Sequence, residues 1–216
     1  HLYARRQRQM CIRDSLSSGA GEKIFKLGGN AIDAAIAVNI VQGVVAPETC
    51  GIGGDLFALI WKDGEDKPYC LDSSGYAGTN VVDIDFSNLE SLPLNHEATV
   101  TVPGAVKGWA EMHKKFGKLD FKILFEEAIK ICNEGFEITH ELNQSLTHHK
   151  EALIKQDSSE SFYLEGEPVQ TGNIVTREKL GKTLSLIAEN GPNIFYEGDI
   201  GAVSYTHLTL PTSIQV

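Results

Sequence analysis

Positive charge is scarce in this chain of 216 residues, which has 19 lysines and arginines against 29 aspartates and glutamates. Four of its arginines stand among the first 15 residues, and Arg177 is the only one beyond them. The formal net charge is −10 at pH 7. Nucleic-acid-binding proteins normally present a basic face. The sequence therefore predicts no nucleic-acid partner.

Long apolar runs are also missing. Crossing a bilayer takes roughly 18–20 consecutive apolar residues. The most apolar stretch falls short of that length, because Asn39 and Gln42 interrupt it. We therefore expect no membrane span.

Cysteine is sparse and unpatterned. Beyond the first 15 residues the chain has Cys50, Cys70 and Cys132, which are far apart and lack Cys-x-x-Cys spacing. This pattern excludes a disulfide framework and a zinc site. It predicts buried free thiols in a reducing compartment, which favours the cytoplasm.

The two ends differ from the body in composition. Residues 1–15 concentrate arginine, and residues 203–216 contain no Asp, Glu, Lys or Arg. Such ends resemble translated linker sequence at the edges of assembled DNA fragments. We expect 1–15 to be a non-native leader, 16–202 the body and 203–216 a non-native tail. A native basic arm and polar tail remain the alternative.

Residues 28–55 organise the body. Gly28-Gly29 permits a tight turn, Asn30 can cap a following helix, and Asp33 suits the positive end of that helix. Residues 31–45 are apolar nearly all round, which is typical of a buried helix. Pro47 cannot continue it.

Hydrophobic patterns predict the remaining elements. A helix over 17–27 should turn Ile24, Phe25 and Leu27 inward. Strands over 55–61 and 67–72 should form a hairpin, and the continuous apolar run of the first predicts cover on both faces. A long excursion over 73–98 and a loop over 157–173 are expected. A short strand is expected over 100–102, and further helices over 105–116, 121–133, 139–154 and 176–190, the last three capped by Asp120, Thr139 and Thr176. This order predicts an α+β or layered α/β fold.

The residues alone yield no complete catalytic set. Gly51-Ile52-Gly53-Gly54 follows a helix and opens a strand, the reverse of a dinucleotide fingerprint. Adjacent His148 and His149 cannot share one helix face as metal ligands, and Glu126-Glu127 is typical of a solvated surface. Asp55 is expected to organise the glycine bend through backbone N–H groups, with a side chain that only faces water as the alternative. We expect no cofactor and no metal.

Several strings nevertheless resemble the γ-glutamyltranspeptidase (glutathione hydrolase) family. Three segments carry the clearest likeness: Lys26-Leu27-Gly28-Gly29-Asn30-Ala31-Ile32-Asp33-Ala34-Ala35, Gly43 to Gly54, and Val102-Pro103-Gly104-Ala105-Val106-Lys107-Gly108-Trp109. Phe116-Gly117-Lys118-Leu119 and Phe195-Tyr196-Glu197-Gly198 continue it. The resemblance runs from about residue 16 to 202.

This resemblance implies a four-layer αββα sandwich of the N-terminal-nucleophile (Ntn) hydrolase type, made as a precursor that cuts itself in two. A threonine at the new N-terminus would attack γ-glutamyl or other acyl amides, forming an acyl-enzyme that water or an amine resolves. This chain resembles only the large-subunit part, so its partner would be its own small subunit. The threonine would lie beyond this sequence, and the chain alone should be inactive.

The resemblance also points to two substrate-binding candidates. In the family an arginine after the second strand grips the substrate's α-carboxylate, and the patterns of two branches place it at Ser74 or at Tyr76. Neither position is arginine here. Two alternatives therefore stay open: an amide hydrolase of the cephalosporin-acylase type, and a non-catalytic binding relative.

Overall fold

The computed structural model describes residues 11–77, 87, 90–91 and 99–202. Within this part, the chain forms two compact units. The first contains residues up to 51 and residues 113–189, and the second contains residues 52–112 and those from 190 onward. Part of the expected excursion over 73–98 and the expected tail after 202 lie outside the described residues.

The first unit is mainly helical. Its α-helices are α2 (Cys11–Lys26), α3 (Ala31–Val45), α5 (Glu126–Glu134), α6 (His140–His148), α7 (Lys150–Leu153) and α8 (Glu178–Asn190). Short strands form two antiparallel pairs, β3 (Phe136–Glu137) with β6 (Ile174–Val175), and β4 (Tyr163–Leu164) with β5 (Glu167–Pro168). Two 3₁₀ segments, Phe121–Phe125 and Asp157–Phe162, complete the unit.

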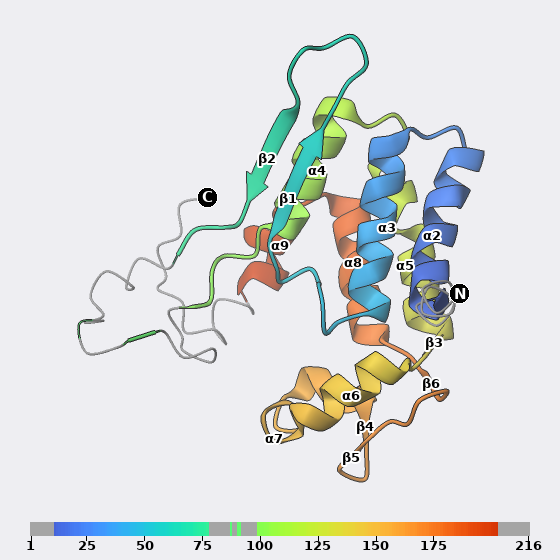
Figure 1. Cartoon of the computed structure of the whole chain (residues 1–216), viewed down its shortest axis with the longest axis vertical. Helices are drawn as coiled ribbons and strands as arrows, with labels where there is room; N and C mark the ends of the chain where they lie inside the picture. The colour runs from blue at the N-terminus through green and yellow to red at the C-terminus, as the bar shows by residue number, and fades with distance from the viewer. Residues whose placement is uncertain (1–10, 78–86, 88–89, 92–98, 203–216) are drawn as a thin grey trace, which may run out of the picture. The chain divides into compact units, whose positions relative to one another are not determined.

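Helix α3 is the buried helix that the sequence predicts. Ile36, Ile40 and Val41 are each at most 1% exposed. Helix α2 lies beside it (Figure 1), and Gly21 allows close approach, because a Cβ there would stand 2.9 Å from Val38 Cγ2. Small side chains therefore form the contact between these two helices.

The N-terminus of α3 is held by a capping box that also reaches a distant loop. The Asn30 side chain accepts hydrogen bonds from the backbone of Ile32 and Asp33, and Asp33 Oδ2 accepts from Asn30 N. Fully buried Asp33 also accepts from Lys118 N at 3.0 Å and Leu119 N at 3.3 Å. The predicted caps are confirmed, and Asp33 additionally ties α3 to residues 118–119.

The C-terminus of α3 is held by Arg177. Its Nη1 donates to the carbonyl oxygens of Gly43 and Val44, both at 3.0 Å. The guanidinium also lies over the Phe162 ring, 5.4 Å from its centroid. Burial lowers the pKa of Arg177, yet a guanidinium stays charged in proteins. A cation at this end of a helix complements the helix dipole.

The second unit contains β1 (Leu56–Ile60), β2 (Tyr69–Ser73), the first two turns of α4 (Ala105–Phe116), and α9 (Asn193–Tyr196). β1 and β2 pair antiparallel, from Leu56 opposite Ser73 to Ile60 opposite Tyr69, which confirms the hairpin. One face of the hairpin packs on α4, where a Cβ on Gly108 would stand 2.5 Å from Leu56 Cδ2.

Tyr196 joins α9 to the start of α4. Its hydroxyl donates to the carbonyl oxygen of Pro103 at 2.8 Å and accepts from Lys107 N at 2.9 Å. The side chain is buried. The phenol therefore satisfies one of the N–H groups that the first turn of a helix leaves without a partner.

Two predictions of burial are wrong, one for Phe25 and Leu27 and one for the second face of β1. In α2 the buried positions are Ser17, Ala20, Gly21 and Ile24, a stripe at helical spacing made mostly of small residues. Phe25 and Leu27 fall off this stripe and are 56% and 50% exposed. In β1 burial alternates, so within the described chain the strand is covered on one face only.

Smaller corrections concern other segments. Residues 121–125 are 3₁₀ rather than α-helical, the expected loop 157–173 contains a 3₁₀ turn and a short hairpin, and α8 starts at Glu178 rather than at Thr176. Thr139 caps α6 as predicted, but the single helix expected over 139–154 is interrupted at His149, which separates α6 from α7. No disulfide links Cys50, Cys70 and Cys132 in the described residues. Of these three expected buried thiols only Cys132 is buried, whereas Cys50 is half-buried and Cys70 is exposed. Burial raises the pKa of the Cys132 thiol to about 11.

Replacing the Asp33 carboxylate should destabilise the first unit. In Asp33→Asn, an amide N–H₂ group would face backbone N–H donors from two segments. We expect the free energy of unfolding, measured by urea denaturation, to fall by about 2–3 kcal/mol, because hydrogen bonds to a charged group are the strong ones. Asp120→Asn is the matched control, since Asp120 is an exposed cap of Lys122 N and Asn caps equally well. Equal losses in both variants would contradict this role of Asp33.

Removing one hydroxyl should weaken the second unit. In Tyr196→Phe, the half-buried Lys107 N–H and Pro103 carbonyl oxygen lose their shared partner. We expect a loss of about 1–3 kcal/mol in the same measurement. Tyr76→Phe removes a hydroxyl from a side chain that is 72% exposed, and should leave stability unchanged. If Tyr196→Phe left the free energy of unfolding unchanged, the phenol would not stabilise the start of α4.

Candidate functional site

The sequence candidates Ser74 and Tyr76 lie where the chain leaves β2 and crosses residues 101–105. Ser73 Oγ donates to the Gly104 carbonyl oxygen at 2.8 Å. On the other side of the crossing, the backbone N–H groups of Gly104 and Ala105 both donate to the Gly54 carbonyl oxygen, at 3.0 and 2.9 Å. Three separate segments of the second unit are thereby fixed at one point.

Glycine is required on both sides of this crossing. Gly75 has a φ of +75°, and a Cβ there would overlap the Val102 carbonyl oxygen. A Cβ on Gly104 would overlap the Ser73 carbonyl oxygen. These contacts fix the path of the loop that carries the two candidates.

Ser74 is held through its backbone. Its N–H donates to Asp72 Oδ1 at 3.1 Å, and its carbonyl oxygen accepts from Thr101 Oγ1 at 3.2 Å. Thr101 Oγ1 also lies 3.5 Å from Asp55 Oδ1. The side chain of Ser74 is half-buried. Asp55 was expected to organise the glycine bend, but the hydrogen bond described for it joins it to Thr101 instead.

Tyr76 combines a fixed backbone with an exposed ring. Its carbonyl oxygen accepts from Val102 N at 2.9 Å, and the neighbouring Ala77 forms an isolated antiparallel bridge with Thr101. The side chain is 72% exposed. The phenol is therefore available to a ligand at this loop, and its hydroxyl can donate one hydrogen bond.

The charge of this region is negative. Residues 52–55, 72–77 and 101–105 include no Lys or Arg, whereas Asp55 and Asp72 contribute carboxylates. A ligand's carboxylate would meet no cation from these segments. Arg177 belongs to the first unit, where its guanidinium donates to the carbonyl oxygens of Gly43 and Val44 at the end of α3. This loop is thus suited to hydrogen bonds with uncharged groups of a ligand.

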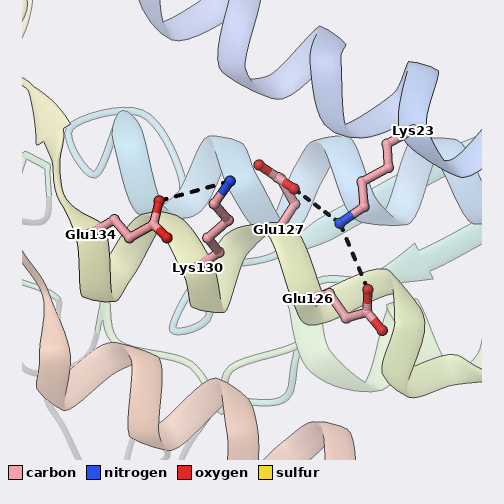
Figure 2. Close-up of polar contacts among 5 residues, drawn as sticks. All are labelled: Lys23, Glu126, Glu127, Lys130 and Glu134. Carbon is pink, nitrogen blue, oxygen red and sulfur yellow. Dashed lines mark hydrogen bonds and ion pairs between the residues drawn. The ribbon is translucent and has the colours of Figure 1, made fainter.

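The adjacent carboxylates of Glu126 and Glu127 take part in surface ion pairs. Figure 2 shows Lys23 of α2 between Glu127 and Glu126 of α5, at 3.1 and 3.7 Å. On the same helix Lys130 pairs with Glu134. Adjacent glutamates that share a surface lysine are not an acid–base pair, so the solvated reading of Glu126-Glu127 is supported.

Metal and membrane features are not found in the part of the chain that the structure describes. His, Cys, Asp and Glu residues form no cluster of three or more that could hold a metal ion there. Among the same residues, no helix is both long enough and apolar enough to cross a membrane.

Sequence reasoning assigned no structural role to Thr101, which contacts the loop after β2, or to Tyr196, which contacts Pro103 and Lys107. A strand was expected over 100–102, but the structure has only an isolated bridge there, between Thr101 and Ala77. Tyr196 reaches residues more than 85 positions earlier in the chain. Neither contact leaves a local signal in the sequence. Ser74 and Tyr76 were found only through the family resemblance.

Comparison with known proteins gives a consistent result. The family model described as gamma-glutamyltranspeptidase matches residues 17–209. A glutathione hydrolase-like YwrD proenzyme from Bacillus subtilis is 32% identical over 195 residues, which are 89% of this chain and 37% of that protein.

Solved structures are also similar. The γ-glutamyltranspeptidase of Helicobacter pylori is 30% identical with a TM-score of 0.81, and the match covers 89% of this chain and 57% of that one. A cephalosporin acylase from Bacillus halodurans is 31% identical with a TM-score of 0.79, covering 88% and 37%. The expected α+β fold of the Ntn-hydrolase type is therefore confirmed.

The match is long within this chain but short within its relatives. The chain spans about a third of the length of the curated relatives it matches. The family model nevertheless covers most of the body, including the segments that form the loop crossing. This chain belongs to the γ-glutamyltranspeptidase family.

Proposed function

We propose that this chain is the large-subunit part of a self-processing Ntn hydrolase that cleaves γ-glutamyl amide bonds of the glutathione type. The family match over residues 17–209 carries the proposal. The names of several relatives support it, since they are glutathione hydrolases, some of them proenzymes. A proenzyme name is consistent with a small subunit as this chain's partner.

The chemistry would use a threonine that this sequence does not supply. Its hydroxyl oxygen attacks the amide carbonyl carbon while its own α-amine takes the proton. The C–N bond then breaks, the leaving amine takes that proton, and an ester to the threonine remains. Water hydrolyses the ester, or an acceptor amine takes the acyl group. The chain described here would contribute one wall of the acyl pocket, with Ser74 and Tyr76 on it.

A second candidate substrate class is an acyl amide without an α-carboxylate. The observation that favours it is the absence of Lys and Arg from residues 72–77, together with the carboxylate of Asp72. Similarity to a cephalosporin acylase is in keeping with it. A hydrogen bond from a neutral phenol contributes about 1 kcal/mol, against about 1.5–3 kcal/mol for one to a charged group. Selection for an α-carboxylate should therefore be weak.

The test is hydrolysis of two matched anilides by the complete polypeptide of the gene. γ-Glutamyl anilide and 4-aminobutanoyl anilide differ only in the α-carboxylate. We expect turnover of both, with kcat/KM values within about tenfold, because a neutral contact separates them by no more than about 1.4 kcal/mol. Changing the small-subunit threonine to alanine should abolish both activities. If the complete polypeptide hydrolysed neither anilide, the proposed reaction would be contradicted.

Restoring a cation should restore carboxylate selection. In Tyr76→Arg, a guanidinium can bind the α-carboxylate through two hydrogen bonds. We expect the ratio of kcat/KM for the γ-glutamyl over the 4-aminobutanoyl anilide to rise by about 10–100-fold. Ser74→Arg is the matched control at the other candidate position. An increase only in Ser74→Arg would move the contact to position 74, and no change in either variant would place it outside this loop.

A further inference from the structure

Glycine at position 53 is not explained by the contacts of the described chain. Gly64 and Gly75 have positive φ values. A Cβ on Gly104 or Gly108 would collide with a neighbouring atom. Gly53 meets neither condition, because its φ lies outside the left-handed region and a Cβ there would have nothing within 4 Å among the described residues. The missing side chain therefore provides open backbone surface, to which a ligand can come close.

The backbone of this bend is accessible. Gly53 is exposed and Ile52 is half-buried. Among the hydrogen bonds of the described residues, none is donated by the N–H group of Ile52 or of Gly53. Backbone N–H groups that become covered need an acceptor. The bend thus offers two neighbouring donors, and at position 53 no side chain keeps an acceptor away from them.

The bend belongs to the same hydrogen-bonded framework as the loop after β2, which carries the two candidate residues. The carbonyl oxygen of Gly54 accepts from Gly104 N at 3.0 Å. Thr101 Oγ1 lies 3.2 Å from the Ser74 carbonyl oxygen and 3.5 Å from Asp55 Oδ1. All of these segments are part of the second unit. Residues 101–104 therefore connect the glycine bend to the loop that would meet the substrate.

The chemistry of these segments indicates what the bend can bind. Residues 52–55, 72–77 and 101–105 include no Lys or Arg, so backbone N–H groups and hydroxyls are the donors that they offer. We propose that the acyl part of the amide substrate lies against the backbone of Ile52 and Gly53, with one of its oxygen atoms accepting from these N–H groups. Gly53 is then a specificity-determining position, because a side chain there would occupy the space of the acyl chain. This inference rests on the proposed function, because it concerns the same substrate.

Adding one methyl group tests the proposal. Gly53→Ala is made in the complete polypeptide whose small-subunit threonine has been changed to alanine, so that γ-glutamyl anilide binds without being hydrolysed. We expect the Kd, measured by calorimetry, to rise at least tenfold, because the new Cβ takes the space of the acyl chain. The Tm should not fall, because this Cβ meets no described atom and alanine restricts the unfolded chain more than glycine does.

Gly19 provides the matched control. It is exposed, it lies in α2 of the first unit, and a Cβ there would also have nothing within 4 Å. Gly19→Ala should leave the Kd unchanged. An unchanged Kd in Gly53→Ala would overturn the inference. A higher Kd together with a lower Tm would also overturn it, because the close neighbour of Gly53 would then be another segment of the polypeptide.

Binding and turnover separate this inference from the proposed function. If the polypeptide with its threonine intact binds the anilide without hydrolysing it, the function is removed and the Kd of Gly53→Ala still decides the inference. Hydrolysis by the intact polypeptide, with an unchanged Kd in Gly53→Ala, would leave the function and remove the inference. Neither binding nor hydrolysis would overturn both.

Discussion

Opposite charges at the two ends of α3 are the constraint on which the first unit depends. Buried Asp33 stands at the positive end of the helix and binds the backbone of residues 118–119. Arg177 stands at the negative end and binds the last carbonyls. Each charge is stabilised by helix dipoles and backbone groups rather than by a counter-charge. A helix almost without polar side chains is thereby fixed in position by two residues from different parts of the sequence.

The sequence predicted the elements that depend on local signals. The Asn30 cap, the 56–73 hairpin, α4 and the Thr139 cap all follow from residues within a few positions of one another. It did not predict contacts between distant residues, such as Asp33 with Leu119 or Arg177 with Val44. The burial predicted for Phe25 and Leu27 was wrong, because it was based on hydrophobicity alone. The buried stripe of α2 consists mostly of small residues.

Prediction of the candidate site was limited in another way. Composition and spacing indicated no catalytic set, and Ser74 and Tyr76 came from family resemblance. The physical organisation of their loop depends on crossing backbones, which no periodic pattern reveals. The two-sided cover expected for β1 was inferred from its continuous apolar run. Burial along the strand alternates, so the described chain covers one face only.

The crossing at Gly75 and Gly104 separates the shape of the loop from its chemistry. Backbone contacts and two glycines determine the path, whereas the Tyr76 side chain projects from that path into solvent. A substitution at position 76 therefore changes the chemistry that the loop presents without altering the backbone contacts that determine its path.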